Sequence, residues 1–166
     1  METSTLYLVC GKIAAGKSTF ARQLASRPRT LLIGMDHWMS TLFPVENRTI
    51  DDFTRLSARL RDVMGPHVVG ILRQDLSVVL DFSANTVKWR SWMRSLINEA
   101  NVAHELHFLD VPDAICKHRL RQRNINGEHP YEVDEPTYDL FMSQFIPPTS
   151  DEGFNVIIHT PQLPSR

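Results

Sequence analysis

The sequence predicts an α/β fold in which a parallel sheet is covered by helices on both faces. Short apolar runs alternate with longer amphipathic segments along the 166 residues, which is typical of strand–helix repeats. The runs VVL (78–80) and VII (156–158) are apolar at successive positions, as expected of strands buried on both faces. A loop with two glycines and two lysines, residues 11–18, leads from the first expected strand into the first expected helix.

The expected elements follow one another in strand–helix order, without an internal repeat. We expect strands at 6–10, 31–35, 77–82, 105–111 and 154–159. We expect helices at 18–26, 86–100, 112 to about 124, and 135–146. Pro28 stops the first helix, and Pro112 lies near the first position of the third, where its missing N–H costs nothing. Residues 50–74 read as largely helical, with an interruption at Gly65-Pro66.

The composition fits one cytosolic domain spanning residues 1–166. With 18 basic and 19 acidic residues the net charge is −1, which weighs against an obligate nucleic-acid coat protein. Cys10 and Cys116 lie far apart and form no CxxC pair, so we expect both to be reduced and buried. We expect no signal peptide, because no leading basic segment precedes a short apolar run. We expect no membrane span, because no apolar stretch approaches the roughly 20 residues that a span needs.

Residues 11–18, GKIAAGKS, match the phosphate-binding pattern G-x-x-x-x-G-K-[ST]. The glycines allow a tight bend, so that successive N–H groups and the following helix N-terminus face an anion. Lys17 is expected to reach the β- and γ-phosphates of ATP, and Ser18 to ligate Mg²⁺. A chance match is expected in about one of 200 sequences. The residues expected to hold the nucleotide are Gly11, Lys12, Ile13, Ala14, Ala15, Gly16, Lys17, Ser18 and Thr19.

A magnesium ion in such a site also needs a carboxylate at the end of a neighbouring buried strand. Asp81 ends VVLD and Asp110 ends LHFLD. Because Asp110 precedes Val-Pro-Asp, it fits the start of a helix. We therefore predict Asp81 as the carboxylate on the metal side, with a structural turn aspartate as the alternative.

Asp36 follows the second expected strand, in LLIGMDHWMS. Ligands of open α/β sheets gather at the carboxyl ends of strands. A carboxylate there can accept the proton of a hydroxyl that attacks the γ-phosphate; the alternative is a helix cap. Trp38, two residues on, could stack on a substrate ring or simply pack.

Two arginine pairs have helical i, i+4 spacing. Arg119 and Arg123 share a face in CKHRLRQRN (116–124), and arginines so placed can stabilise the negative charge of a transferring phosphoryl group. The alternative is a solvated basic face. Arg90 and Arg94 repeat the spacing, and Arg90 is a candidate for contact with the substrate or a phosphate.

These segments resemble the P-loop kinases grouped with zeta toxin, chloramphenicol phosphotransferase and the kinase domain of polynucleotide 5′-kinases. The resemblance covers nearly the whole chain and is carried by GKIAAGKSTFARQLA, GMDHWMSTLFP, SVVLDFSANTVKWR and LHFLDVPDAICKHRLRQRN. It implies a P-loop NTPase three-layer sandwich with a five-stranded parallel sheet of order 2-3-1-4-5. It also implies that Asp36 is the general base. Arg119 and Arg123 would belong to a short lid at about 119–136 and grip the nucleotide and the transferring phosphoryl group, so the resemblance adds Arg119 to the residues that bind the nucleotide.

The expected function is an ATP-dependent phosphotransferase that moves the γ-phosphate to a hydroxyl of a small molecule, of antibiotic, nucleoside or sugar type. Family members also phosphorylate nucleic-acid ends, so the fold leaves the acceptor open. A 5′-hydroxyl nucleic-acid kinase is one alternative, although near-neutral charge weighs against it. The other is a slow ATPase switch that acts through a protein partner. The sequence leaves the oligomeric state and the choice between ATP and GTP open.

Overall fold

The computed structural model describes residues 3–129 and 132–161. Its strands are β1 (Thr5–Gly11), β2 (Thr30–Gly34), β3 (Ser77–Asp81), β4 (Ala103–Leu109) and β5 (Val156–His159). Its helices are α1 (Lys17–Ala25), α2 (Met35–Leu42), α3 (Ile50–Leu72), α4 (Val87–Ala100), α5 (Asp113–Asn126) and α6 (Glu135–Met142), with a 3-10 helix η1 (Ser150–Glu152). The expected domain bounds include residues 1–2 and 162–166, and the expected lid includes 130–131; these lie outside the described residues.

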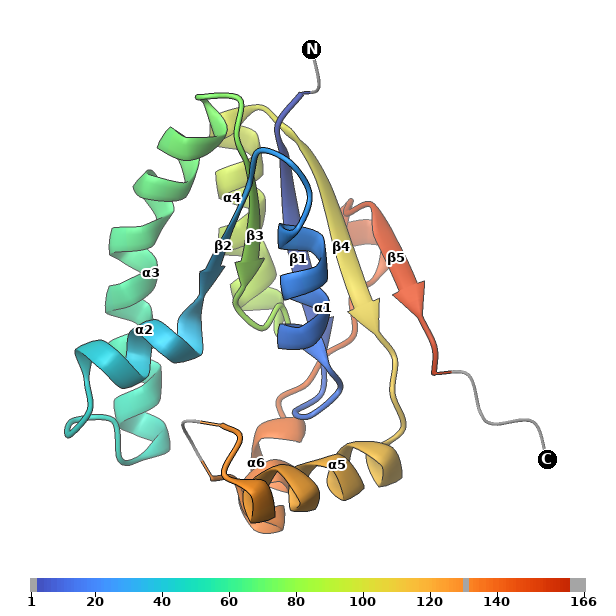
Figure 1. Cartoon of the computed structure of the whole chain (residues 1–166). Helices are drawn as coiled ribbons and strands as arrows, with labels where there is room; N and C mark the ends of the chain where they lie inside the picture. The colour runs from blue at the N-terminus through green and yellow to red at the C-terminus, as the bar shows by residue number, and fades with distance from the viewer. Residues whose placement is uncertain (1–2, 130–131, 162–166) are drawn as a thin grey trace.

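The five strands form one parallel sheet in the order β2-β3-β1-β4-β5. This order confirms the one that the family resemblance implies. In register, Leu8 of β1 lies beside Leu80 of β3 on one side and Leu106 of β4 on the other. Because all strands run the same way, their carboxyl ends meet along one edge, which is the lower edge in Figure 1.

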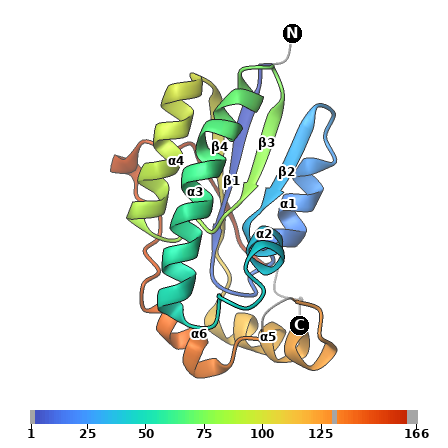
Figure 2. The same cartoon turned by 90° about the vertical axis from the view of Figure 1, so that its left-hand side faces the viewer.

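Helices cover both faces of the sheet, as predicted. Side chains of β1 alternate between the two faces: Leu6 and Leu8 belong to the larger core with α3 and α4, whereas Tyr7 and Val9 pack with α1. Helices α3 and α4 lie side by side on one face (Figure 2). β1 is thus buried on both faces, which explains its unbroken apolar run.

The expected interruption at Gly65-Pro66 is wrong, because α3 continues through both residues. Pro66 is exposed on the outer side of the helix, while Gly65 is buried against α4. A Cβ at Gly65 would lie 3.4 Å from both Trp92 and Leu96. An internal proline costs a helix about 3 kcal/mol, so we attribute the continuity of α3 to this packing, which sequence propensity does not register.

The structure adds a helix that the sequence did not predict and shortens another. Residues 35–42 form α2 directly after β2, and at eight residues it is too short to show a clear helical period. Helix α6 ends at Met142 rather than at residue 146. Asp36 therefore lies in the first turn of a helix and not in a loop.

The two cysteines are free and fully buried, as the sequence predicted. Burial raises the pKa of the Cys10 thiol to about 12. The thiol of Cys116 also has a raised pKa because it is buried. Across residues 3–129 and 132–161, every helix is too short or too polar to cross a bilayer.

Candidate active site

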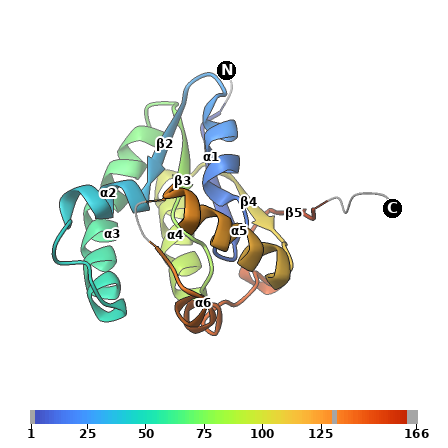
Figure 3. The same cartoon turned by 60° about the horizontal axis from the view of Figure 1, so that its bottom comes forward.

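The predicted site residues, with one exception, lie near the carboxyl edge of the sheet. The loop between β1 and α1, the start of α2, and the end of β3 all lie along this edge. Helices α5 and α6 lie below it (Figure 1, Figure 3). The topology thus brings together side chains that are up to about a hundred residues apart in the sequence.

The phosphate-binding loop has the backbone conformation that its glycines predict. Gly11 has φ +154° and Gly16 has φ +101°, a region that residues with a Cβ rarely adopt. A Cβ at Gly11 would also lie 3.0 Å from the carbonyl oxygen of Leu109. Ala15 N–H donates to the Lys12 carbonyl at 3.1 Å. The loop is therefore a tight turn that leads into the N-terminus of α1.

Lys17 folds back over this loop. Its Nζ donates to the carbonyl oxygens of Gly11 and Lys12, at 2.7 Å each. Burial lowers the pKa of Lys17, and the nearby carboxylates of Asp81 and Asp36 act in the opposite direction. The ammonium group thus lies at the centre of the site, next to the loop that would hold an anion.

Ser18 and Asp81 lie side by side, as a shared magnesium site requires. Burial raises the pKa of Asp81, while a hydrogen bond from the Ser18 hydroxyl lowers it. Hydroxyl and carboxylate oxygens suit Mg²⁺. Asp110 is exposed at the end of β4, and its N–H donates to the His159 carbonyl at 2.8 Å. Asp81 is therefore the residue that fits the ion.

Within the described ranges, no three His, Cys, Asp or Glu side chains come close enough to hold a metal. A magnesium ion at Ser18 and Asp81 would then take its remaining ligands from phosphate oxygens and water, as in other phosphoryl-transfer sites.

Asp36 faces the same centre from the first turn of α2. Its side chain is 45% exposed, and its charge acts on Lys17, Asp81 and Arg123. His129, which follows α5, places Nε2 3.1 Å from Asp36 Oδ2. The carboxylate thus lies between the phosphate-binding loop and the segment that follows α5.

The two arginines of α5 reach different parts of the site. Arg119 Nη1 donates to the Ala15 carbonyl of the loop at 3.2 Å. Arg123 lies one turn further along, and its buried Nε has no hydrogen-bond partner among the described residues. Burial lowers the pKa of Arg123, and Asp36 acts in the opposite direction. The predicted shared face of this pair therefore points into the site.

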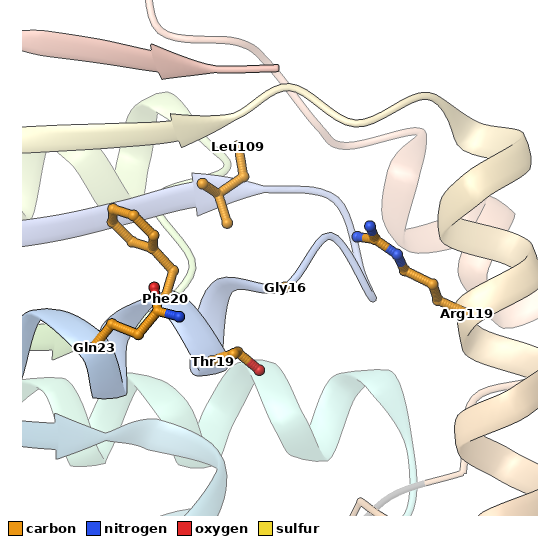
Figure 4. A pocket seen from close by; sticks show the side chains of 6 residues that line it. All are labelled: Gly16, Thr19, Phe20, Gln23, Leu109 and Arg119. Atoms are coloured by element: carbon orange, nitrogen blue, oxygen red, sulfur yellow. The ribbon is translucent and has the colours of Figure 1, made fainter. Parts of the chain in front are cut away.

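A cavity of about 430 Å³ adjoins the phosphate-binding loop at Gly16 (Figure 4). Arg119 reaches toward it from α5, and Phe20 and Gln23 line it from α1. Its remaining lining residues are Gly16, Thr19 and Leu109.

An anchor joins α5 to the loop. Lys12 Nζ lies 3.2 Å from Asp113 Oδ1, and the Tyr138 hydroxyl donates to the same oxygen at 2.9 Å. Together with the bond from Arg119, this anchor holds α5 close to the phosphate-binding loop.

Arg90 is the exception among the predicted site residues. It is 0% exposed, and all of its donors bind protein oxygens. Nε and Nη2 bind the two carboxylate oxygens of Glu152 at 2.7 and 3.0 Å. The other acceptors are the carbonyls of Ala84, Ile146 and Pro147. Arg90 therefore offers no donor to a substrate, and the sequence could not show this because Glu152 lies 62 residues away.

Trp38 is 38% exposed on α2, two residues after Asp36, so a contact with a substrate ring stays a prediction.

Two residues of the site were missed by the sequence reasoning. Asn85 binds the backbone N–H and carbonyl of Gly11, and its place shortly after a buried strand was an available signal. His129 meets Asp36 across 93 residues, for which the sequence holds no local signal.

The family of the chain follows from its sequence. A family model described as "AAA domain" matches residues 6–148. The chain belongs to this AAA domain family. The comparison with curated proteins found no match.

Solved structures share the fold of this AAA domain protein at low identity. Kti12 of Chaetomium thermophilum, solved with ADP-AlF3, has a TM-score of 0.71 and 14% identity over 95% of this chain and 89% of its own. A candidate kinase from Chloroflexus aurantiacus has a TM-score of 0.76 and 20% identity, over 96% and 86%. The APS kinase CysC of Mycobacterium tuberculosis, solved with AMPPNP and APS, has 0.62 and 18%, over 98% and 91%. The fold is therefore that of P-loop kinases.

Proposed function

We propose that the protein is an ATP-dependent kinase that transfers the γ-phosphate to the hydroxyl group of a small molecule. One observation carries this proposal: the Asp36 carboxylate lies beside the phosphate-binding loop, where its charge acts on Lys17 and Arg123. A carboxylate on the acceptor side of the γ-phosphate is suited to take a proton from an attacking hydroxyl.

In the proposed reaction, the acceptor oxygen forms a bond to the γ-phosphorus. The bond from that phosphorus to the bridging oxygen breaks, ADP leaves, and the acceptor's proton goes to Asp36. Lys17 and Arg123 stabilise the charge on the phosphoryl oxygens. Mg²⁺ held by Ser18 and Asp81 would neutralise phosphate charge. The cavity beside Arg119 has room for the nucleoside.

His129 and the proposed acceptor would contact different oxygens of the Asp36 carboxylate. His129 contacts Oδ2 at 3.1 Å, which leaves the other oxygen of the carboxylate for the acceptor hydroxyl. Trp38 is exposed on the same helix and is suited to contact a ring of an antibiotic, nucleoside or sugar. The proposed acceptor therefore carries a hydroxyl next to a flat or partly apolar body.

The test is ADP release from ATP and Mg²⁺ with separate pools of nucleosides, nucleotide sugars, antibiotics and 5′-hydroxyl oligonucleotides. One pool should stimulate release, and Asp36→Asn should lower the stimulated turnover by about 10²- to 10⁴-fold. Its affinity for ATP should change little, because the substitution keeps the shape of the side chain. Asp62→Asn, at a carboxylate that is 71% exposed, is the matched control.

Near-normal turnover of Asp36→Asn with the stimulating pool would sink the assigned role of this residue. A slow basal rate that no pool and no variant changes would favour a nucleotide switch that acts through a protein partner. Stimulation only by oligonucleotides, with binding that weakens steeply as salt rises, would favour a nucleic-acid kinase.

A further inference from the structure

Asn85 lies four residues after β3 and forms two hydrogen bonds with the backbone of Gly11, the first residue of the phosphate-binding loop. Its Oδ1 accepts from the Gly11 N–H at 2.9 Å, and its Nδ2 donates to the Gly11 carbonyl at 2.7 Å. The β1–β3 pairing ends at Leu8, but Ala84 N–H still donates to the Val9 carbonyl at 3.0 Å. The Asn85 carboxamide thus continues the hydrogen bonding on the β3 side of β1 as far as Gly11, the last residue of the strand.

The Gly11 carbonyl accepts a second hydrogen bond, from Lys17. Lys17 Nζ binds it at 2.7 Å and binds the Lys12 carbonyl at the same distance. The ammonium group has three donors, so Lys17 can offer the third to a phosphate oxygen, or it can give up one of the carbonyls for phosphate. A buried acceptor without a partner costs about 1–3 kcal/mol. The Asn85 carboxamide remains on Gly11 and keeps that carbonyl satisfied.

The segment that carries Asn85 is itself held in place. The Asn85 carbonyl accepts from the Ile146 N–H at 2.9 Å. Arg90 donates to the carbonyls of Ala84 and Ile146, at 2.9 and 2.7 Å, and is fixed by Glu152. Residues 146–152 therefore hold the segment of Asn85 in place through the buried Arg90. Arg90 thus supports the site from behind and contacts no ligand.

We propose that Asn85 is a positioning residue of the nucleotide site. It holds both the N–H and the carbonyl of Gly11 in place when Lys17 binds phosphate oxygens. This inference rests on the nucleotide-binding part of the proposed function, and not on the acceptor or on the role of Asp36.

The test measures the dissociation constants of ADP and AMPPNP, each with Mg²⁺, by calorimetry. Asn85→Ala removes both hydrogen bonds, and we expect about 10- to 100-fold weaker binding. Asn85→Asp keeps the shape and the acceptor for Gly11 N–H but cannot donate to the Gly11 carbonyl. Its added charge also attracts Lys17 away from phosphate, so we expect a comparable loss.

Two controls separate positioning from plain stability. Val78→Ala removes buried volume from β3 and should lower Tm while leaving the dissociation constants within about twofold. Asn98→Ala changes an exposed amide of α4 and should change neither quantity. Asn85 variants that bind both nucleotides as tightly as a Val78→Ala protein of similar Tm would overturn the inference.

Amide hydrogen exchange of the wild-type protein tests the same point without a variant. The Gly11 amide should exchange slowly both with and without nucleotide, because Asn85 holds it in both states. Fast exchange in the nucleotide-bound state would overturn the inference. Failure of the wild-type protein to bind either nucleotide would overturn this inference together with the proposed kinase activity, whereas equal binding by wild type and Asn85 variants would overturn this inference alone.

Discussion

At the scale of single residues, the ion pair of Arg90 and Glu152 should make stability depend on pH. The hydrogen bond from Arg90 holds the pKa of Glu152 below its ordinary value. The unfolded chain therefore binds this proton more readily, so the stabilisation is full above pH about 4.3 and fades as pH falls below it. Glu152→Gln should lower the free energy of unfolding by about 1–3 kcal/mol at pH 7.

The measurement is urea unfolding of wild type and Glu152→Gln at pH 7 and near pH 3.5. The gap between the two should narrow at the lower pH, because a protonated Glu152 resembles glutamine. Glu99→Gln, on the exposed side of α4, is the control. A gap of the same size at both pH values would contradict the assigned charge pairing.

At the scale of elements, we expect the internal proline of α3 to be dispensable for stability. Pro66 is exposed inside an unbroken helix, so Pro66→Ala should restore one backbone hydrogen bond without loss of packing. Helix propensity favours alanine over proline by about 3 kcal/mol. Loss of the proline ring also gives the unfolded chain more conformational entropy, which offsets about 1 kcal/mol of this gain. We expect a net gain of about 1–2 kcal/mol in thermal or urea unfolding. Unchanged or lower stability would show that the ring makes a useful contact.

At the scale of the whole molecule, the site is assembled from β1, α1, α2, β3 and α5, so nucleotide binding should stabilise the entire fold. At a nucleotide concentration of 100 times Kd the expected gain is about 2.7 kcal/mol, or about 5–10 °C in Tm. Lys17→Met should abolish most of this shift. Lys88→Met, at an exposed position of α4, should keep it, and a full shift in Lys17→Met would contradict the central place of this ammonium group.

The sequence predicted those parts of the molecule whose cause is local. The loop glycines, the apolar run of β1, Asp36 shortly after β2 and Asp81 at the end of β3 all have short-range signals, and parallel topology then places the loop and both aspartates on one edge. Arg90 was misjudged because its partner Glu152 comes from a segment 62 residues away. The continuity of α3 through Gly65 likewise depends on Trp92 and Leu96 of another helix. Tertiary contacts of this kind leave no mark in spacing or propensity.

The two buried thiols can report when the structure around each of them opens. A protonated, inaccessible thiol does not react with an alkylating reagent, so Cys10 and Cys116 should be labelled only when the structure around them opens. Cys10 lies in β1 directly before the phosphate-binding loop, and Cys116 lies in α5. Their separate labelling rates, resolved by mass spectrometry, would time the opening of the central strand and of the arginine helix independently in the unmodified protein.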